Sequence, residues 1–232
     1  MITAIILAAG RGSRMKSEEK KQFMMLNGHR VIYYSLTAFA KCGIDKIVLV
    51  ASNEDRKLCE EAIDDAGLSE MTVITEGGEN RYDSVYNGLQ KAAGSDFVLI
   101  HDGARPAISE EVIKKCIEEV KTKAAVIVAV KAKDTIKITN EEGIIKSTPD
   151  RNYIWLAQTP QAFDYNLIKS GFDKMFEDGG EQMITDDAMI VERYMKHPVY
   201  VVEGDYRNIK LTTPEDMEVL SLYIEGKSRN DC

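Results

Sequence analysis

The sequence predicts an α/β fold: a Rossmann-like, mostly parallel sheet with helices on both faces, plus a protruding β-hairpin arm. Apolar runs alternate with helical segments through the first half of the chain, which is the rhythm of successive βαβ units. These apolar runs are almost unbroken, as expected for parallel strands that are buried on both faces. A polar, alternating stretch at 134–148 breaks the rhythm and predicts the hairpin.

The elements of the first half are bounded by capping residues. Glycine tolerates the left-handed backbone of a helix C-terminus, so helices are expected to stop at Gly43, Gly67 and Gly94. Asn53 and Ser109 are the predicted N-caps, because their side chains can accept a hydrogen bond from the first turn. The expected strands are 2–7, 46–51, 71–75, 97–101 and 125–130, and the expected helices are 31–42, 53–66, 80–93 and 109–123.

The second half is less regular. Residues 135–139 and 144–147 are expected to pair around a turn at 140–143. Such a thin hairpin is stable only when it packs on another surface, so 134–151 is predicted to be an arm that contacts a second subunit of a homodimer. The other expected elements are strands at 153–158, 199–203 and 208–211, a helix from Asp164, a helix capped by Thr185 with Asp186 and Asp187 in its first turn, and a helix from Thr213-Pro214.

The bulk composition excludes several classes of protein. The net charge of -8 argues against a general nucleic-acid binder, because phosphate backbones need a basic face. No apolar run approaches the roughly 20 residues of a membrane span, and Met1 leads directly into a strand, so neither a membrane segment nor a signal peptide is expected. Four scattered cysteines without Cys-x-x-Cys spacing indicate a cytoplasmic setting. Without repeats or linkers, residues 1–232 are expected to form a single domain that carries the arm.

A glycine-containing loop follows the first strand. The run 8–12 allows backbone N–H groups to approach phosphate oxygens, and Arg14 and Lys21 add positive charge beside it. No Walker motif is present, and Met15 replaces the third glycine of a dinucleotide fingerprint. The loop therefore indicates a triphosphate site, with a simple tight turn as the alternative. Because Lys20 adjoins Lys21, which of the two points inward stays open.

Polar residues also follow the other predicted strands. Gly77-Gly78 either forms a plain turn or presents N–H groups to a base or phosphate, and Ser84 lies one helical turn beyond Asn80. Asp102 is placed either to hold Mg²⁺, which triphosphate chemistry generally needs, or to cap a turn. Because ligands of open parallel sheets bind beyond the strands' carboxyl ends, the candidate segments are 76–84, 101–106, 131–135 and 205–210.

Four titratable residues near these segments have plain structural interpretations. Arg81 is expected to join a surface ion pair, and Asp186 and Asp187 to complement the dipole of the helix that they begin. His101 is expected to pack behind the neighbouring strand end rather than to act in catalysis. No Ser-His-Asp or Cys-His arrangement for covalent catalysis can be assembled from the sequence.

Taken together, these segments resemble the 2-C-methyl-D-erythritol 4-phosphate cytidylyltransferase family. The resemblance spans nearly the whole chain, and its one noted departure is Lys20, where the family usually has proline. The matching motifs are Leu-Ala-Ala-Gly-x-Gly-x-Arg-Met (7–15), Lys-Gln-Phe (21–23), Gly-Gly-x-x-Arg-x-Asp-Ser-Val (77–85), His-Asp-Gly-Ala-Arg-Pro (101–106), Asp-Thr-Ile-Lys (134–137), Asp-Arg (150–151), Gln-Thr-Pro-Gln-x-Phe (158–163), Thr-Asp-Asp-Ala (185–188) and Gly-x-x-x-Asn-Ile-Lys (204–210).

The resemblance implies a reaction and roles for individual residues. The 4-phosphate of methylerythritol phosphate would attack the α-phosphorus of CTP and release pyrophosphate with Mg²⁺, as a step of non-mevalonate isoprenoid biosynthesis. The implied catalytic cations are Arg14, Lys21 and Lys210. The residues implied for CTP are Leu7, Ala8, Ala9, Gly10, Gly12, Gly78, Ser84, Gly103 and Arg105. Those implied for the sugar phosphate are Asp102, Thr135, Arg151 and Thr185, with Thr135 and Arg151 on an arm that reaches the neighbouring subunit.

Three alternatives remain beside this reading. A ribitol-5-phosphate cytidylyltransferase would share the fold and a similar first half, whereas Arg151-x-x-x-Trp155 and the segment 187–192 favour methylerythritol phosphate. A nucleotide-binding module without catalysis would not need the three cations that the resemblance places at the site. A nicotinamide dehydrogenase would need the third glycine that Met15 replaces.

Overall fold

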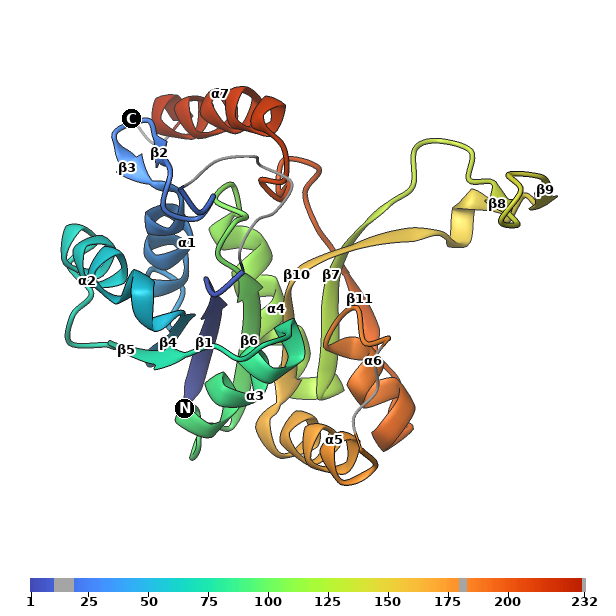
Figure 1. Ribbon diagram of the computed structural model, residues 1–232, viewed down its shortest axis with the longest axis horizontal. Coiled ribbons are helices and arrows are strands. Elements are labelled where there is room, and N and C mark those ends of the chain that lie inside the picture. Colours follow the sequence, from blue (N-terminus) through green and yellow to red (C-terminus); the bar gives the residue numbers. More distant parts are fainter. Residues whose placement is uncertain (11–18, 180–182, 231–232) are drawn as a thin grey trace.

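A computed structural model describes residues 1–10, 19–179 and 183–230 (Figure 1). Arg14 and Gly12 therefore lie outside the described residues. The strands are β1 (Ile2–Leu7), β2 (Met25–Leu26), β3 (His29–Arg30), β4 (Lys46–Ala51), β5 (Thr72–Glu76), β6 (Phe97–Asp102), β7 (Ala125–Lys131), β8 (Ile138–Thr139), β9 (Ile145–Ser147), β10 (Trp155–Asp164) and β11 (Tyr200–Glu203). The helices are α1 (Val31–Ala40), α2 (Arg56–Asp65), α3 (Arg81–Lys91), α4 (Glu110–Lys123), α5 (Tyr165–Glu177), α6 (Ala188–Ile190) and α7 (Pro214–Asn230).

The seven-stranded central sheet has the order β11-β7-β10-β6-β1-β4-β5. Neighbouring strands are parallel except around β10, which runs antiparallel to both β6 and β7. This exception follows from the chain path, because the arm returns the chain to the sheet without a crossover helix. The predicted mostly parallel α/β sheet is therefore confirmed.

Helices cover both faces of this sheet. Ile6 points into a core formed with α1, α2 and α4, whereas Ile5 points into a core formed with α3, α5 and α6. Both side chains are fully buried, as is expected of a strand with a helix layer on either side. The carboxyl ends of β1, β4, β5 and β6 consequently meet at one edge, with α7 lying across the same end of the molecule (Figure 1).

Some predicted elements differ from the observed ones. Asn53 is not the cap of a long helix, because it begins a 3₁₀ turn, η2 (Asn53–Asp55), that precedes α2. No strand forms at 208–211, where the buried amide of Asn208 instead donates to the carbonyl of Thr159 at 2.8 Å. The backbone N–H groups of Asn208, Ile209 and Leu211 donate to the carbonyls of Asp205, Arg207 and Ala104 rather than to a neighbouring strand.

The helix for which Thr185 was the predicted cap begins later in the chain than expected. Observed helix α6 begins only at Ala188, and its last residue leads into a π-helical turn, η4 (Val191–Met195). The N–H and hydroxyl of Thr185 lie 3.4 and 3.0 Å from the sulfur of Met189, so this threonine does not cap the helix. Oδ1 of Asp186 accepts from the N–H of Met189 instead.

The predicted hairpin is present as an arm that projects away from the sheet (Figure 1). Its strands β8 and β9 are shorter than predicted, and Oδ1 of Asn140 accepts from the N–H of Ile144 across the turn. The side chain of Tyr153 at the base of the arm is 81% exposed. The arm also exposes the isoleucines at 138, 144 and 145, which is an unusual amount of apolar surface for so small an element.

In the described part of the chain, no helix combines the length and the apolar composition that crossing a membrane would require.

Candidate active site

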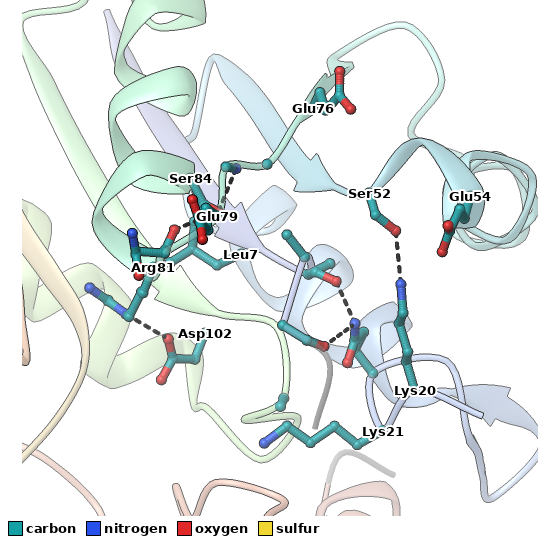
Figure 2. A pocket seen from close by; sticks show the side chains of 18 of the residues that line it. Leu7, Lys20, Lys21, Ser52, Glu54, Glu76, Glu79, Arg81, Ser84 and Asp102 are labelled. Atoms are coloured by element: carbon teal, nitrogen blue, oxygen red, sulfur yellow. Dashed lines mark hydrogen bonds and ion pairs between the residues drawn. The ribbon is translucent and has the colours of Figure 1, made fainter. Parts of the chain in front are cut away.

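A cavity of about 770 Å³ lies at the carboxyl ends of the strands (Figure 2). Its volume is in the range typical of sites for small molecules and cofactors. The cavity brings together nine of the predicted site residues that the structure describes, and all of them come from segments that follow or flank sheet strands. They are Leu7, Ala8, Ala9, Gly10, Lys21, Gly78, Ser84, Asp102 and Lys210.

The glycine loop forms one wall of this cavity. The backbone turns out of β1 after Leu7, and the N–H of Ala8 donates to the carbonyl of Val50 at 2.7 Å. The buried side chain of Gln22 donates from Nε2 to the carbonyl of Ala8, and more weakly to that of Gly10 at 3.3 Å. Gln22 therefore holds the end of β1 to the segment that carries Lys21, a role that was not predicted from the sequence.

The two lysines of this segment point in different directions (Figure 2). Nζ of Lys20 donates to Oγ of Ser52 at 2.8 Å and to Oδ2 of Asp55 at 2.5 Å. Lys21 extends into the cavity instead. The choice that the sequence left open is thus resolved by Asp55, whose carboxylate holds Lys20 against the end of β4.

The second wall is the Gly77-Gly78 turn before α3. A side chain on Gly77 would place its Cβ 2.4 Å from Cβ of Ala9, so glycine is required where the two loops touch. The N–H of Gly78 donates to Oγ of Ser84 at 3.0 Å, and this hydroxyl lies within reach of the carbonyl of Asn80 at 3.2 Å. The turn is thereby fixed beside the glycine loop rather than left free to adapt.

The third wall of the cavity contains Asp102, whose carboxylate is surrounded by three cationic side chains. Its side chain is 11% exposed, and Nζ of Lys210 lies 2.8 Å from Oδ2. Nε of Arg81 lies 3.5 Å from Oδ1, and Nε of Arg105 lies 3.7 Å from Oδ2. Burial raises the pKa of Asp102, but the nearby charges of Arg81, Lys210 and Arg105 outweigh it and hold that pKa far below its ordinary value.

The contacts of Asp102 make it a poor candidate for a metal ligand. Three cationic side chains already surround the carboxylate, and they would repel a divalent ion placed against the same oxygens. Within the described residues there is also no group of three or more His, Cys, Asp or Glu side chains that could hold a metal ion. The predicted metal role of Asp102 is therefore disfavoured by the charges around it.

His101 packs behind Asp102, in line with the prediction. The ring is fully buried, and Nδ1 lies 3.0 Å from Oγ1 of Thr159. That hydroxyl also accepts from the N–H of Asp102 at 3.1 Å, so Thr159 links the ring to the backbone of its neighbour. Burial lowers the pKa of His101 to about 3, and the imidazole is neutral at physiological pH.

This buried imidazole predicts a loss of stability in acid. Since the folded pKa of about 3 lies below the ordinary 6.5, the unfolded chain binds more protons below pH 6.5. The contribution of the neutral imidazole to the free energy of unfolding is fully present above pH 6.5. It falls by about 1.4 kcal/mol per pH unit as the pH drops towards 3. Urea unfolding of wild type and His101→Gln between pH 7.5 and 5 should show a shallower decline for the variant. Parallel declines would contradict this assignment.

The other predicted residues do not line the cavity. A Cβ on Gly103 would lie 3.0 Å from the carbonyl oxygen of Leu7, so this glycine allows β1 and the end of β6 to pack closely. Arg105 approaches Asp102 from behind and donates from Nη1 to the carbonyl of Asn208 at 2.8 Å. The remaining three lie elsewhere: Thr135 and Arg151 belong to the arm segment, and Thr185 lies beside Met189.

One pair at the site joins residues that the sequence analysis treated separately. Arg81 does form the expected ion pair, but its partner is Asp187, which was expected only to complement a helix dipole, and both N–O distances are 2.8 Å. Asp187 is 1% exposed. The only sequence signal for this pair is that each residue lies within a motif, because the partners stand 106 positions apart.

Comparison with known proteins identifies the family. The sequence model of the family described as 2-C-methyl-D-erythritol 4-phosphate cytidylyltransferase matches residues 2–226. Proteins of that name from Lachnoclostridium phytofermentans and Lachnospira eligens are 50% and 44% identical over 217 and 227 residues, covering 93% and 97% of this chain and 93% and 100% of theirs.

Solved structures agree with the sequence comparison. The 4-diphosphocytidyl-2C-methyl-D-erythritol synthase of Anaerococcus prevotii superimposes with a TM-score of 0.85 at 34% identity, covering 97% of this chain and 98% of that one. The Francisella tularensis 2-C-methyl-D-erythritol 4-phosphate cytidylyltransferase superimposes with a TM-score of 0.77 at 30% identity, covering 96% and 99%. This chain belongs to the 2-C-methyl-D-erythritol 4-phosphate cytidylyltransferase family.

Proposed function

We propose that this protein transfers a cytidylyl group from CTP to 2-C-methyl-D-erythritol 4-phosphate, giving 4-diphosphocytidyl-2-C-methylerythritol and pyrophosphate for non-mevalonate isoprenoid synthesis. Family membership supports this reaction. The structural observation that carries it is the convergence of Lys21, Lys210 and Arg81 on one cavity beside the glycine loop. Positive side chains at the edge of an otherwise acidic protein suit a triphosphate and a sugar phosphate bound side by side.

The chemistry requires positioning and charge more than a covalent nucleophile. A phosphate oxygen of the sugar forms a bond to the α-phosphorus, while the bond from that phosphorus to the oxygen bridging to the β-phosphate breaks. Pyrophosphate leaves with the electron pair. Lys21 and Lys210, together with Arg14 as proposed from the sequence, stabilise the charge that develops on the phosphate oxygens.

The two substrates are proposed to occupy opposite parts of the cavity. The loop from Leu7 to Gly10, together with Gly12 as expected from the sequence, holds the nucleotide along with Gly78 and Ser84, because N–H groups and small side chains allow close approach. Asp102 faces the sugar phosphate. Its carboxylate can accept hydrogen bonds from the hydroxyl groups of that substrate. Gly103 and Arg105 support this arrangement from behind the cavity wall.

We propose that the divalent cation enters with CTP, bound to phosphate oxygens, rather than on a carboxylate cluster of the protein. The cations around Asp102 support this, since they leave that carboxylate poorly suited to a metal. Mg²⁺ commonly keeps several waters and binds mainly through substrate phosphates. Its chemical contribution when bound would be to neutralise charge on the triphosphate.

A cytoplasmic location is proposed from the cysteines and the polar substrates. Cys42, Cys59 and Cys116 are free and buried in the described part of the chain. Burial raises the pKa of these thiols to about 11, 12 and 12. Such thiols are poor nucleophiles and act as small apolar side chains, which suits a protein of a reducing compartment.

The arm is proposed to complete the site of a second subunit in a homodimer. Arg151 and Thr135 lie on a projecting arm with exposed apolar side chains, and such surface is typical of a subunit contact. We expect light scattering to give the mass of a dimer. Mixing inactive Lys21→Ala and Arg151→Ala subunits should restore roughly a quarter of wild-type activity, since each heterodimer regains one intact site. A monomer, or no recovery on mixing, would contradict this arrangement.

The proposed reaction is tested by pyrophosphate release from CTP in the presence of each pentitol phosphate. We expect turnover with 2-C-methyl-D-erythritol 4-phosphate and at least ~100-fold lower kcat/KM with ribitol 5-phosphate, whose hydroxyl pattern would leave polar groups of the site unpaired. Faster turnover with ribitol 5-phosphate would instead assign the alternative activity. Absence of turnover with both acceptors would contradict a cytidylyltransferase of this kind.

A further inference from the structure

The ion pair between Arg81 and Asp187 joins two distant parts of the chain at the cavity. Nη1 and Nη2 of Arg81 lie 2.8 Å from Oδ1 and Oδ2 of Asp187, which is the planar fork geometry that arginine offers a carboxylate. Asp187 is almost fully buried, whereas Arg81 also lines the cavity. The pair therefore ties the start of α3 to the segment that precedes α6.

Local physics disfavours both members of this pair. Arg81 is the first residue of α3, where the positive end of the helix dipole repels a cation. Burying Asp187 removes a carboxylate from water, a cost that apolar residues of similar size would avoid. A chain that breaks a local rule at its active-site cavity usually gains something there in return.

Asp187 is also held from the side of the sheet. The N–H groups of Asp187 and Ala188 each donate to Oε1 of Gln161 at 3.0 Å, and Gln161 lies in the central strand β10. Segment 185–188 is thus hydrogen-bonded to Gln161 of β10 on one side and to Arg81 of α3 on the other. Thr185, proposed to contact the sugar phosphate, lies two residues before Asp187.

The third guanidinium nitrogen of Arg81, Nε, faces Asp102 at the cavity. Nε lies 3.5 Å from Oδ1 of Asp102 (Figure 2), whereas Lys210 contacts the other oxygen, Oδ2, at 2.8 Å. In the proposed reaction Lys210 also stabilises the phosphate oxygens of CTP, whereas Asp187 holds both terminal nitrogens of Arg81 in place. Asp102 therefore keeps a fixed cationic neighbour throughout the reaction.

We propose that Arg81, held by Asp187, is the positioning residue of the sugar-phosphate end of the cavity. It sets the place of Asp102 relative to segment 185–188, and this inference rests on the proposed function. The nucleotide is held by the glycine loop and the Gly78 turn. Breaking the Arg81–Asp187 pair should therefore weaken binding of the sugar phosphate and leave binding of CTP unchanged. That selectivity distinguishes positioning from a general contribution to folding.

The test compares Asp187→Asn with its neighbour Asp186→Asn, both in the full-length protein. Asp186 is the matched control, because its carboxylate accepts from Nε2 of Gln161 and from the N–H of Met189, whereas both terminal nitrogens of Arg81 bind Asp187. Asp187→Asn should raise KM for the sugar phosphate about tenfold or more and leave KM for CTP within about twofold, as expected when a charged hydrogen-bonded pair is lost. Arg81→Lys, which keeps the charge but loses the fork, should fall between wild type and Asp187→Asn.

Kinetics are measured with whichever pentitol phosphate wild type turns over, so the acceptor's identity is decided separately. Equal sugar-phosphate KM values for Asp187→Asn and Asp186→Asn would overturn the inference. So would a parallel rise of both KM values in step with lost thermal stability. If Asp187→Asn fails to fold, the double variant Arg81→Gln/Asp187→Asn removes both buried charges together. A raised sugar-phosphate KM in that variant supports the inference, and a wild-type value overturns it.

Discussion

Replacing Lys21 with alanine is expected to lower kcat by about 100-fold or more while the protein stays folded. Lys21 extends into the cavity beside the glycine loop, where its charge can stabilise the phosphate oxygens as pyrophosphate departs. Removing one preorganised charge of this kind typically costs on the order of 3 kcal/mol of transition-state stabilisation. Steady-state pyrophosphate release measures kcat, and urea unfolding reports whether the fold is retained.

Lys20→Ala is the natural comparison, because the two lysines are adjacent but point apart. Lys20 contacts Ser52 and Asp55, so its loss should destabilise the loop and reduce kcat by several-fold at most. A folded Lys21→Ala variant with the wild-type rate would remove Lys21 from the proposed mechanism. The same holds if Lys20→Ala proved the more damaging of the two substitutions.

Asp102→Asn is expected to lower kcat/KM for the sugar phosphate by about 100-fold. The carboxylate lies beside Arg81, Lys210 and Arg105 at the edge of the cavity, and the neutral amide would remove the negative charge that orients Lys210 and Arg105. Lys210 should then sample positions away from the substrates. The measurement is the pair of KM values and kcat, with each substrate varied in turn.

Asp205 provides the control for this substitution. It also follows a sheet strand, but its carboxylate pairs with Arg207, 2.6 Å away, rather than facing the cavity. Asp205→Asn should change kcat/KM by no more than about threefold, as is usual for a surface ion pair. Wild-type kcat/KM in a folded Asp102→Asn variant would show that the cation cluster does not depend on this carboxylate.

Elements with strong local sequence signals, such as apolar runs and capping residues, were predicted correctly from the sequence. The unbroken apolar runs gave β1 and β4 with the predicted boundaries, and Ser109 caps α4 through a 3.3 Å bond from the N–H of Val112. The glycine loop and the Gly78 turn meet because parallel strands end at one edge of a sheet. Periodicity and capping act within a few residues, and those elements were accordingly predictable.

The misses concern contacts between distant parts of the chain. Nothing near Arg81 or Asp187 reveals that a partner 106 residues away will pair with it. The direction of Lys20 depends on Asp55, which is brought near by the path of β4. The start of α6 and the irregular segment at 208–211 likewise involve tertiary hydrogen bonds, made by Gln161 and by Asn208. Side-chain direction and polar networks are properties of the assembled fold.

The proposed catalytic role of the two cavity lysines is tested most directly by a crystal structure with CTP bound. We expect the triphosphate to lie in the cavity between the glycine loop and Asp102. Nζ of Lys21 and of Lys210 should each be within about 3.2 Å of a phosphate oxygen. A triphosphate bound elsewhere on the protein, with both lysines directed into solvent, would contradict it.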